Sequence, residues 1–459
     1  MSDKPYADLV RSLHPRHLAL RAFWSLAWAS YRGGQAYLTA ENLFSHRLEN
    51  SEDFARRLQR AYFLNYCQPV VDTYTAYLFR QPPEVLPAEP VSDLVANADR
   101  MGNGIVSLMK RAATLSSIFG FVLLGVDRPR AAGEFRTRAE ELAAGLNDYL
   151  VLICPPDVIN WACGPDGRVQ WALVCEREND PVLSGYQINS EPRERLRLWT
   201  AEKWTDIGLK GEILAEGGNP FGQAPFVAVK HRDVEPGLIG ESLLANIALV
   251  NREIFNLTSE LQEILARQTF SQLVAEGSAE EYGEAGDIKK LGTSSIFLYP
   301  EGRKAPQYIS PDASQARLLV EQIDRMIDEI YRLASLTRGT VREASAQSGI
   351  SKAYDFLDTN QALADKAGNL AAGFEAILNL ARPDWKGRIR FPRDFGVDDP
   401  SELAANIERA IGLGVGPKFR AQLLAKLART MLAELPEEQR AEVERESQDN
   451  SANPSPVTA

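Results

Sequence analysis

The chain has 459 residues, with 51 Lys and Arg against 62 Asp and Glu, so its formal net charge is −11. Hydrophobic residues make up 44% of the sequence, enough for two or three domains with their own cores. The acidic balance excludes a protein that binds nucleic acid with its whole surface. No apolar run approaches the roughly 20 residues that a membrane-spanning helix needs.

The first 240 residues predict helices followed by short strands. Helical patterns cover residues 6–13, 17–31 and 51–79, with a kink expected at Pro69 inside the third. A Pro-rich connector, 81–90, leads to a helix over 92–119 and a strand over 121–126. Short strands separated by turns then run from 149 to 230, which indicates one antiparallel meander. Helices beside such a sheet predict an α+β fold that is mainly α.

The central stretch, 240–381, carries the most regular pattern. Apolar residues alternate at spacings of three and four in two predicted helices, a period of 3.5 residues. In the first helix they are Leu243, Ile247, Val250, Ile254, Leu257, Leu261 and Ile264, and in the second Leu319, Ile323, Met326, Ile330 and Leu333. Two such stripes can pack on each other within one chain, or on copies of themselves in neighbouring subunits. The pattern leaves both possibilities open.

Residues 271–311 separate these helices and contain several Gly and Pro, a strand-like piece at 295–299 and an acidic run. The run consists of Glu276, Glu280, Glu281, Glu284 and Asp287, with no basic residue among them. It is either a solvated face or a charged rim that docks a basic partner. After the second helix, residues 337–349 form a polar loop with Gly, and a third helical pattern begins at 350.

The C-terminal part predicts one strand over 387–391 and two helices over 401–413 and 417–435. Residues 447–459 are rich in Asn, Ser and Pro, and we expect this tail to be disordered. The glycine-rich piece 412–418 lacks the spacing of a phosphate-binding loop and follows a helix rather than a strand. We interpret it as a turn between two helices.

Motifs that carry chemistry are scarce. His14 and His17 lie three residues apart, but Pro15 separates them and no carboxylate or cysteine cluster lies near, so the sequence predicts no metal site. It contains no serine-hydrolase, zinc-protease or dinucleotide-binding motif. We therefore expect a protein that is not an enzyme and needs no cofactor.

Several pieces of the sequence, taken in order, resemble one protein family. They are residues 31–38 (YRGGQAYL), residues 240–244 (GESLL) with Ile247, Asn251 and Ser259, residues 292–302 (GTSSIFLYPEG) with 307–309, and 347–349 (QSG) with Ala353. In their order and separation across most of the chain they are similar to the portal proteins of tailed double-stranded-DNA bacteriophages. Within this head–tail connector family they resemble a portal-like branch.

The resemblance implies a portal fold and a ring, usually of twelve subunits, at one vertex of the capsid. Its parts would be an α/β wing with antiparallel strands (1–239), a first stem helix (240–270), a small clip (271–311) and a second stem helix (312–336). A tunnel loop (337–349), a long helix with a return strand (350–398), a helical crown (399–446) and the tail (447–459) would follow. The ring would conduct DNA during packaging and ejection.

The resemblance also implies roles for individual residues. The tunnel loop would face DNA through Arg338, Thr340, Arg342, Glu343, Ser345 and Gln347. The stripe residues, Ile264 and Leu319 excepted, would form contacts between subunits. The acidic run of the clip would dock the packaging motor.

Further partners follow from the same resemblance. They are other copies of the chain, double-stranded DNA in transient and sequence-independent contact, the terminase large subunit, major capsid and scaffolding proteins, and a head-completion or adaptor protein. No membrane is involved. The protein would be made in the host cytoplasm and reside in the virion. The alternative is an α+β interaction module, or an enzyme without recognisable motifs, that is a monomer or small oligomer.

Overall fold

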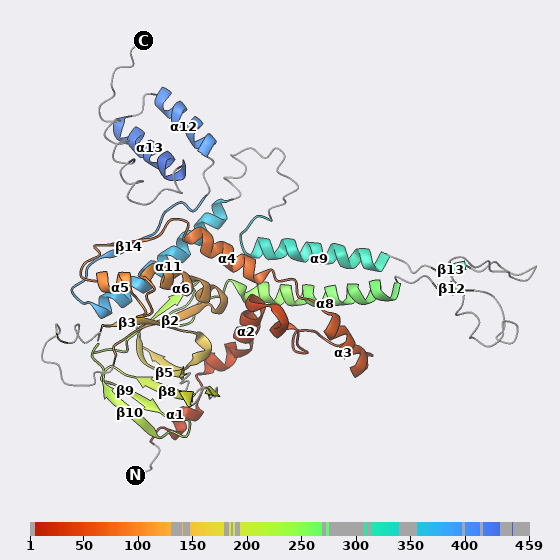
Figure 1. Cartoon of the computed structure of the whole chain (residues 1–459), viewed down its shortest axis with the longest axis horizontal. Coiled ribbons are helices and arrows are strands. Elements are labelled where there is room, and N and C mark those ends of the chain that lie inside the picture. Colours follow the sequence, from red (N-terminus) through yellow and green to blue (C-terminus); the bar gives the residue numbers. More distant parts are fainter. Residues whose placement is uncertain are drawn as a thin grey trace, which may run out of the picture. The chain divides into compact units, whose positions relative to one another are not determined.

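The computed structural model describes residues 5–129, 147–178, 193–268, 314–338, 356–396, 400–413 and 416–431. It also describes the short segments 183–184, 187–188, 272–274 and 307–309, and the single residues 140 and 443. The chain divides into two compact units, Met1–Arg393 and Asp394–Ala459. Figure 1 labels the helices and strands of both units. The fold is α+β, with all strand pairs antiparallel among the described residues.

Short helices form the N-terminal part of the first unit. They are α1 (Ala7–Arg11), α2 (Pro15–Arg32), the 3₁₀ turn η1 (Gly34–Tyr37), α3 (Ser51–Arg60) and α4 (Cys67–Leu78). Because α3 ends at Arg60 and α4 begins only at Cys67, the prediction of one helix over 51–79 is wrong. Pro69 lies in the first turn of α4, where a backbone N–H has no acceptor within the helix, so the proline fits without a kink.

The Pro-rich connector contains a strand that the sequence did not reveal. β1 (Glu84–Leu86) pairs with β14 (Arg388–Arg390), so the return strand predicted near residue 389 is confirmed. The helix predicted over 92–119 is two helices, α5 (Ser92–Ala96) and α6 (Ile105–Phe119). Between them Arg100 and Gly102 have φ angles of 63° and 88°, left-handed conformations that a helix cannot contain.

The predicted single meander is instead two main sheets. One contains β11 (Phe226–Lys230), β2 (Phe121–Asp127) and β3 (Tyr149–Ile153), with β2 in the middle. The other has the order β10 (Ile213–Gly218), β9 (Lys203–Ile207), β8 (Arg193–Trp199), β5 (Val169–Glu178) and β4 (Val158–Cys163). Two short strands, β6 (Leu183–Ser184) and β7 (Gln187–Ile188), pair with each other, and the 3₁₀ turn η2 (Pro155–Asp157) precedes β4.

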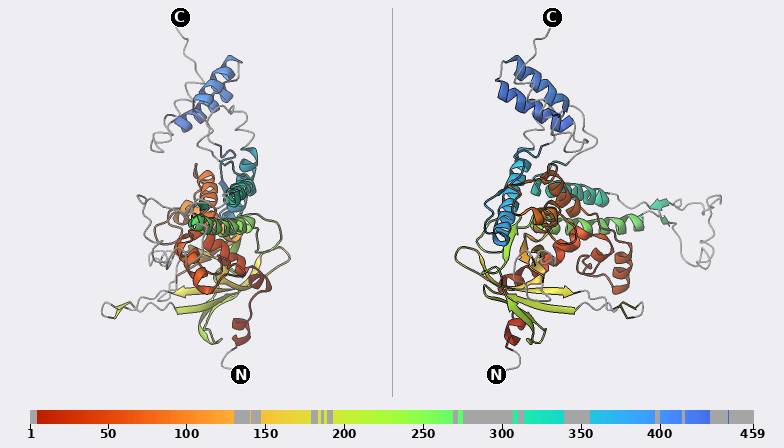
Figure 2. Two further views of the ribbon diagram at one scale, coloured as in Figure 1. Left: turned by 90° about the vertical axis from the view of Figure 1, so that its right-hand side faces the viewer. Right: turned by 60° about the vertical axis from the view of Figure 1, so that its left-hand side comes forward.

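Three long helices complete the first unit: α8 (Leu244–Gln268), α9 (Ser314–Leu333) and α11 (Leu357–Ala381). Figures 1 and 2 show α8 and α9 side by side, extending away from the sheets. β12 (Gln272–Val274) and β13 (Gln307–Ile309) pair beyond their ends. α11 packs on β11 and β2. Gly373 permits this contact, because a Cβ there would lie only 2.7 Å from Cγ2 of Val229.

The second unit contains two packed helices, α12 (Pro400–Gly412) and α13 (Pro417–Met431), where the sequence predicted a helical pair. Within the described ranges, no helix combines the length and the apolar character needed to cross a membrane. The strand predicted at 295–299, the start of the third helix at 350 and the tail 447–459 lie outside the described residues.

Candidate functional site

The two helices with heptad spacing form a hairpin whose apolar stripes face each other. On α8, Ile247 and Ile254 are 1% and 0% exposed, and on α9 Ile323 and Ile330 are 9% and 0% exposed. Half-buried apolar residues pack around this core: Leu243, Val250, Leu257, Leu261, Met326 and Leu333. The stripes therefore pack within one chain.

This packing corrects part of the predicted subunit interface. Atoms already covered inside their own chain cannot also contact a neighbouring subunit. Ile247, Ile254, Ile323 and Ile330 are covered in this way, so the prediction that they join subunits is wrong. For the six half-buried stripe residues, a contact between subunits stays a prediction.

Two buried asparagines attach α8 to the N-terminal part of the chain. The Asn251 side chain accepts a hydrogen bond from the N–H of Tyr66 at 3.0 Å and donates one to the carbonyl of Leu64 at 2.8 Å. The Asn256 side chain, one and a half turns further along α8, accepts from the N–H of Phe44 at 2.8 Å and donates to the carbonyl of Asn42 at 3.0 Å. Each amide thus satisfies main-chain groups that helices do not.

A buried ion pair adds a third attachment between α3 and α8. The guanidinium of Arg57 donates two hydrogen bonds to the carboxylate of Glu49, at 2.8 and 2.7 Å, and both side chains are less than a tenth exposed. These bonds lower the pKa of Glu49 to about 2. Arg57 also donates to the hydroxyl of Ser259 on α8 at 3.2 Å. Ser259 and Asn251, which contributed to the family resemblance, therefore both hold α8 in place.

The start of α8 is fixed to the end of α6. The hydroxyl of Ser242 accepts from the N–H of Leu244 and donates to the carbonyls of Ser117 and Ile118, at 2.9 and 2.7 Å. The two chain segments approach so closely that a Cβ on Gly120 would lie 2.2 Å from the carbonyl oxygen of Gly240.

The C-terminus of α9 ends in a Schellman cap. The N–H of Leu336 donates to the carbonyl of Tyr331 at 2.9 Å, and the N–H of Ser335 donates to the carbonyl of Arg332 at 3.1 Å. Ser335 has a φ of 50°, the left-handed conformation that this cap needs and that glycine usually supplies.

Two hydroxyls attach this cap to neighbouring helices. Tyr74 on α4 donates to the carbonyl of Ala334 at 2.6 Å, and Thr359 in the first turn of α11 donates to the carbonyl of Ser335. The described residues on either side of the predicted tunnel loop are therefore held together. The loop itself falls mostly outside the described residues, including Thr340, Arg342, Glu343, Ser345 and Gln347.

Arg338 is the one predicted DNA-facing residue that the structure describes. Its guanidinium pairs with Asp328 at 2.6 Å and Asp324 at 2.7 Å, both on the solvent side of α9. In this conformation the guanidinium faces its own helix. The predicted motor-docking residues Glu276, Glu280, Glu281, Glu284 and Asp287 lie outside the described residues.

A buried lysine attaches α11 to the rest of the first unit. The amine of Lys366, 1% exposed, lies 2.7 Å from the carbonyl oxygen of Ala113 and 2.8 Å from Nδ1 of His231, and it also bonds the hydroxyl of Ser117. Burial lowers the pKa of the Lys366 amine and of the His231 imidazole well below their ordinary values. Both groups are therefore neutral, and sequence periodicity gave no sign of this cluster.

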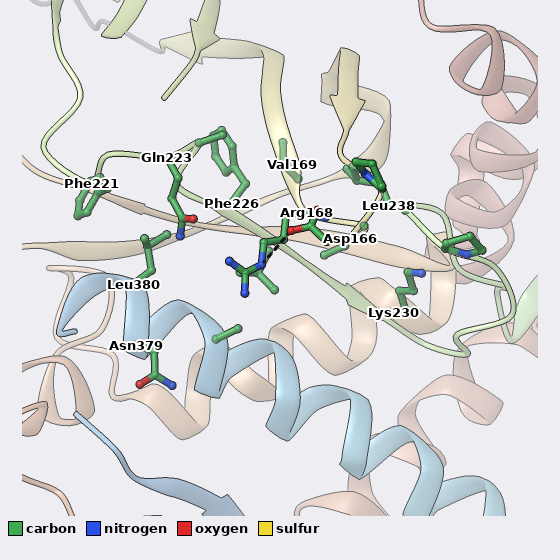
Figure 3. Close-up of a pocket in the computed structure, with 18 of the residues that line it drawn as sticks. Asp166, Arg168, Val169, Phe221, Gln223, Phe226, Lys230, Leu238, Asn379 and Leu380 are labelled. Atoms are coloured by element: carbon green, nitrogen blue, oxygen red, sulfur yellow. Dashed lines mark hydrogen bonds and ion pairs between the residues drawn. The ribbon is translucent and has the colours of Figure 1, made fainter. Parts of the chain in front are cut away.

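A cleft of about 880 Å³ lies between the β4–β5 turn, β11 and α11 (Figure 3). Phe226 and Leu238 contribute apolar surface, and the cations are paired with carboxylates. Lys230 pairs with Asp233 at 2.6 Å, and Arg168 with Asp166 at 3.5 Å. In the described part of the chain, no group of three or more His, Cys, Asp or Glu side chains is placed to hold a metal ion. The cleft thus offers no evident catalytic constellation.

Comparisons with known proteins give matches to solved structures only. No family model matches the sequence, and no curated protein matches it. The neck of an empty GTA particle computed with C6 symmetry includes a chain with 14% identity and a TM-score of 0.46, over 78% of this chain and 89% of that one. A virion of a native gene transfer agent (GTA) particle matches at 14% identity and a TM-score of 0.44, over 78% and 89%.

The neck of a native GTA particle computed with C12 symmetry matches at 13% identity and a TM-score of 0.42, over 76% of this chain and 85% of that one. All three TM-scores lie below 0.5. The functional proposal below therefore rests on the residues of this chain.

The hairpin core leads to a prediction about stability. Replacing Ile254 with Asp puts a carboxylate where the side chain is 0% exposed, and we expect a loss of more than about 3 kcal/mol in the free energy of unfolding. Leu249→Asp on the same helix is the matched control, because that side chain is 47% exposed. Chemical denaturation measures both. Equal stability of the two variants would contradict the core packing of α8 on α9.

The buried amine leads to a prediction about pH. The pKa of Lys366 is lower in the folded state than its model value of 10.5, so between these values the unfolded chain binds more protons and stability rises with pH. Lys366→Met should flatten the dependence of unfolding free energy on pH from about pH 8 to about pH 10, a slope of at most about 1.4 kcal/mol per unit. The exposed Lys386→Met is the control and should leave the slope unchanged. An unaltered slope in Lys366→Met would show that the amine is charged when folded.

Proposed function

We propose that the protein is a phage portal: a ring, built from twelve copies, through which double-stranded DNA is packaged into a capsid and ejected from it. The observation that carries the proposal is the α8–α9 hairpin, a pair of long helices attached firmly at one end to an α+β body. Such a hairpin suits the wall of a channel, because its own core is complete and it can bear load without a partner.

The sequence pieces that resemble portal proteins support this proposal through their positions. Tyr37, from the piece 31–38, stacks on Phe63 at 3.7 Å between ring centroids and contacts Phe255 of α8 edge-on. Asn251 and Ser259 bond the N-terminal segments from the other partner of the contact, α8 itself. Residues from separate resembling pieces thus meet around one helix, as expected if they maintain one structural element.

In this proposal the remaining parts act as the resemblance implies. Residues 271–311 dock the terminase large subunit outside the capsid, the loop after α9 faces DNA, and a head-completion or adaptor protein later joins the ring. Capsid and scaffolding proteins surround it. The protein acts mechanically rather than as an enzyme, without a cofactor, and resides at the portal vertex of the virion after synthesis in the host cytoplasm.

Subunit contacts are assigned to the outer side of α9 rather than to the hairpin core. That side exposes Leu318 and Val320, at 65% and 53%, among charged residues of both signs. A ring needs a heterologous contact, in which one face of each subunit meets a different face of the next. Exposed apolar groups within a mixed-charge surface can supply one.

Particle mass tests the proposal directly. The chain alone has a mass of 50.9 kDa, whereas twelve copies exceed half a megadalton. We expect native mass spectrometry or mass photometry of the full chain to detect the large particle. A monomer or small oligomer at all concentrations would instead favour an α+β interaction module.

Substitutions on the outer side of α9 test the assigned contact. Leu318→Asp combined with Val320→Asp should shift mass from the ring to free subunits while leaving thermal unfolding unchanged, because both side chains are exposed. Leu209→Asp, at a site 57% exposed in the turn after β9, is the matched control and should keep the ring. Rings of normal mass in the double variant would exclude this face as the contact.

A further inference from the structure

Arg338 and two aspartates form a compact ionic cluster on α9. Asp324 and Asp328 are one helical turn apart, and their side chains are 61% and 60% exposed. Beyond the cap at Ser335 the chain turns back along the helix, so that Nη2 of Arg338 reaches Asp324 at 2.7 Å and Nη1 reaches Asp328 at 2.6 Å. Nη1 also lies 3.5 Å from the carbonyl oxygen of Asp324.

The cluster holds one cation between two anions, so its net charge is negative. These carboxylates raise the pKa of Arg338 above its usual value, and the guanidinium stays charged. Ion pairs between exposed side chains stabilise a protein by only about 0–1 kcal/mol each, because water and salt compete for both partners. The guanidinium can therefore leave the aspartates at little cost.

A phosphate diester can take the place of the aspartates. Arginine binds carboxylate and phosphate oxygens with the same planar pair of N–H donors. When the guanidinium moves to a phosphate, Asp324 and Asp328 are left as two unpaired anions close to the negatively charged backbone of the nucleic acid. Their repulsion shortens the life of the contact.

We propose that Asp324 and Asp328 regulate DNA binding by Arg338: they compete with DNA phosphates for its guanidinium. This inference rests on the proposed function, because it takes double-stranded DNA as the ligand. It adds the exchange between carboxylates and phosphate. The aspartates keep each arginine–phosphate contact weak, so that DNA can slide past it.

A double-mutant cycle tests the exchange. Asp324→Asn with Asp328→Asn should tighten the binding of the full chain to a short random-sequence DNA duplex at low salt by about threefold to tenfold, measured by fluorescence anisotropy. The same pair of substitutions combined with Arg338→Ala measures what the loss of two negative charges does by itself. We expect most of the gain to disappear when Arg338 is absent.

A matched control separates this exchange from general electrostatics. Glu329→Gln removes one exposed negative charge from the same helix and breaks the pair with Arg332 at 2.6 Å, but leaves Arg338 untouched. It should change affinity by less than twofold. Salt dependence supplies a second readout, because the aspartate variants should gain about one phosphate contact for each subunit that touches DNA.

The outcomes are distinct. A gain in affinity that persists at full size with Arg338→Ala, or no gain at all, would overturn the inference. Particle mass, measured on the same samples, reports on the ring independently. If the cycle shows the exchange but no ring forms, the proposed function fails while the ionic competition stands. If rings form and the cycle shows no coupling, the reverse holds.

Discussion

The position of α8 depends on two buried amide side chains. Apolar packing is not directional and would let α8 slide or rotate against its neighbours. Asn251 and Asn256 remove that freedom, because each one accepts from and donates to the main chain of a different N-terminal segment. Displacing α8 would leave those buried groups without partners, at about 1–3 kcal/mol each. The polar bonds thus fix the direction in which the hairpin leaves the body.

The rest of the hairpin inherits that direction. α9 packs on α8 through Ile323 and Ile330, and its C-terminal cap is bonded to Tyr74 and Thr359. α11 is in turn attached to α6 and β11 through Lys366. A buried amine contributes little net stability, since desolvation opposes its hydrogen bonds. It does select one arrangement of α11, because only that arrangement satisfies the amine. Successive polar contacts therefore orient elements that apolar contacts hold together.

The sequence predicted the elements of the site better than their surroundings. A 3.5-residue period identifies a helix and its apolar face, so α8 and α9 were found, but it does not say which surface covers that face. Ile254 and Ile330 were therefore assigned to a neighbour when their own chain buries them. The sheets were predicted less well, since β4 and β10 have no clear alternation and β1 pairs with β14, about three hundred residues away. Asn251 was visible only as part of a resemblance, because a buried amide has no periodic signal.

The charge of the chain acts through its arginines as much as through its excess of acid. Arg338 lies between Asp324 and Asp328, Arg332 pairs with Glu329, and further arginines in both sheets and helices face carboxylates. An overall charge of −11 could simply repel DNA. Pairing does something more selective, since each exposed guanidinium is available to a phosphate only in competition with carboxylates of its own chain. Repeated around a ring, such weak contacts would steady a duplex without stopping it, because no single one outlasts the next exchange.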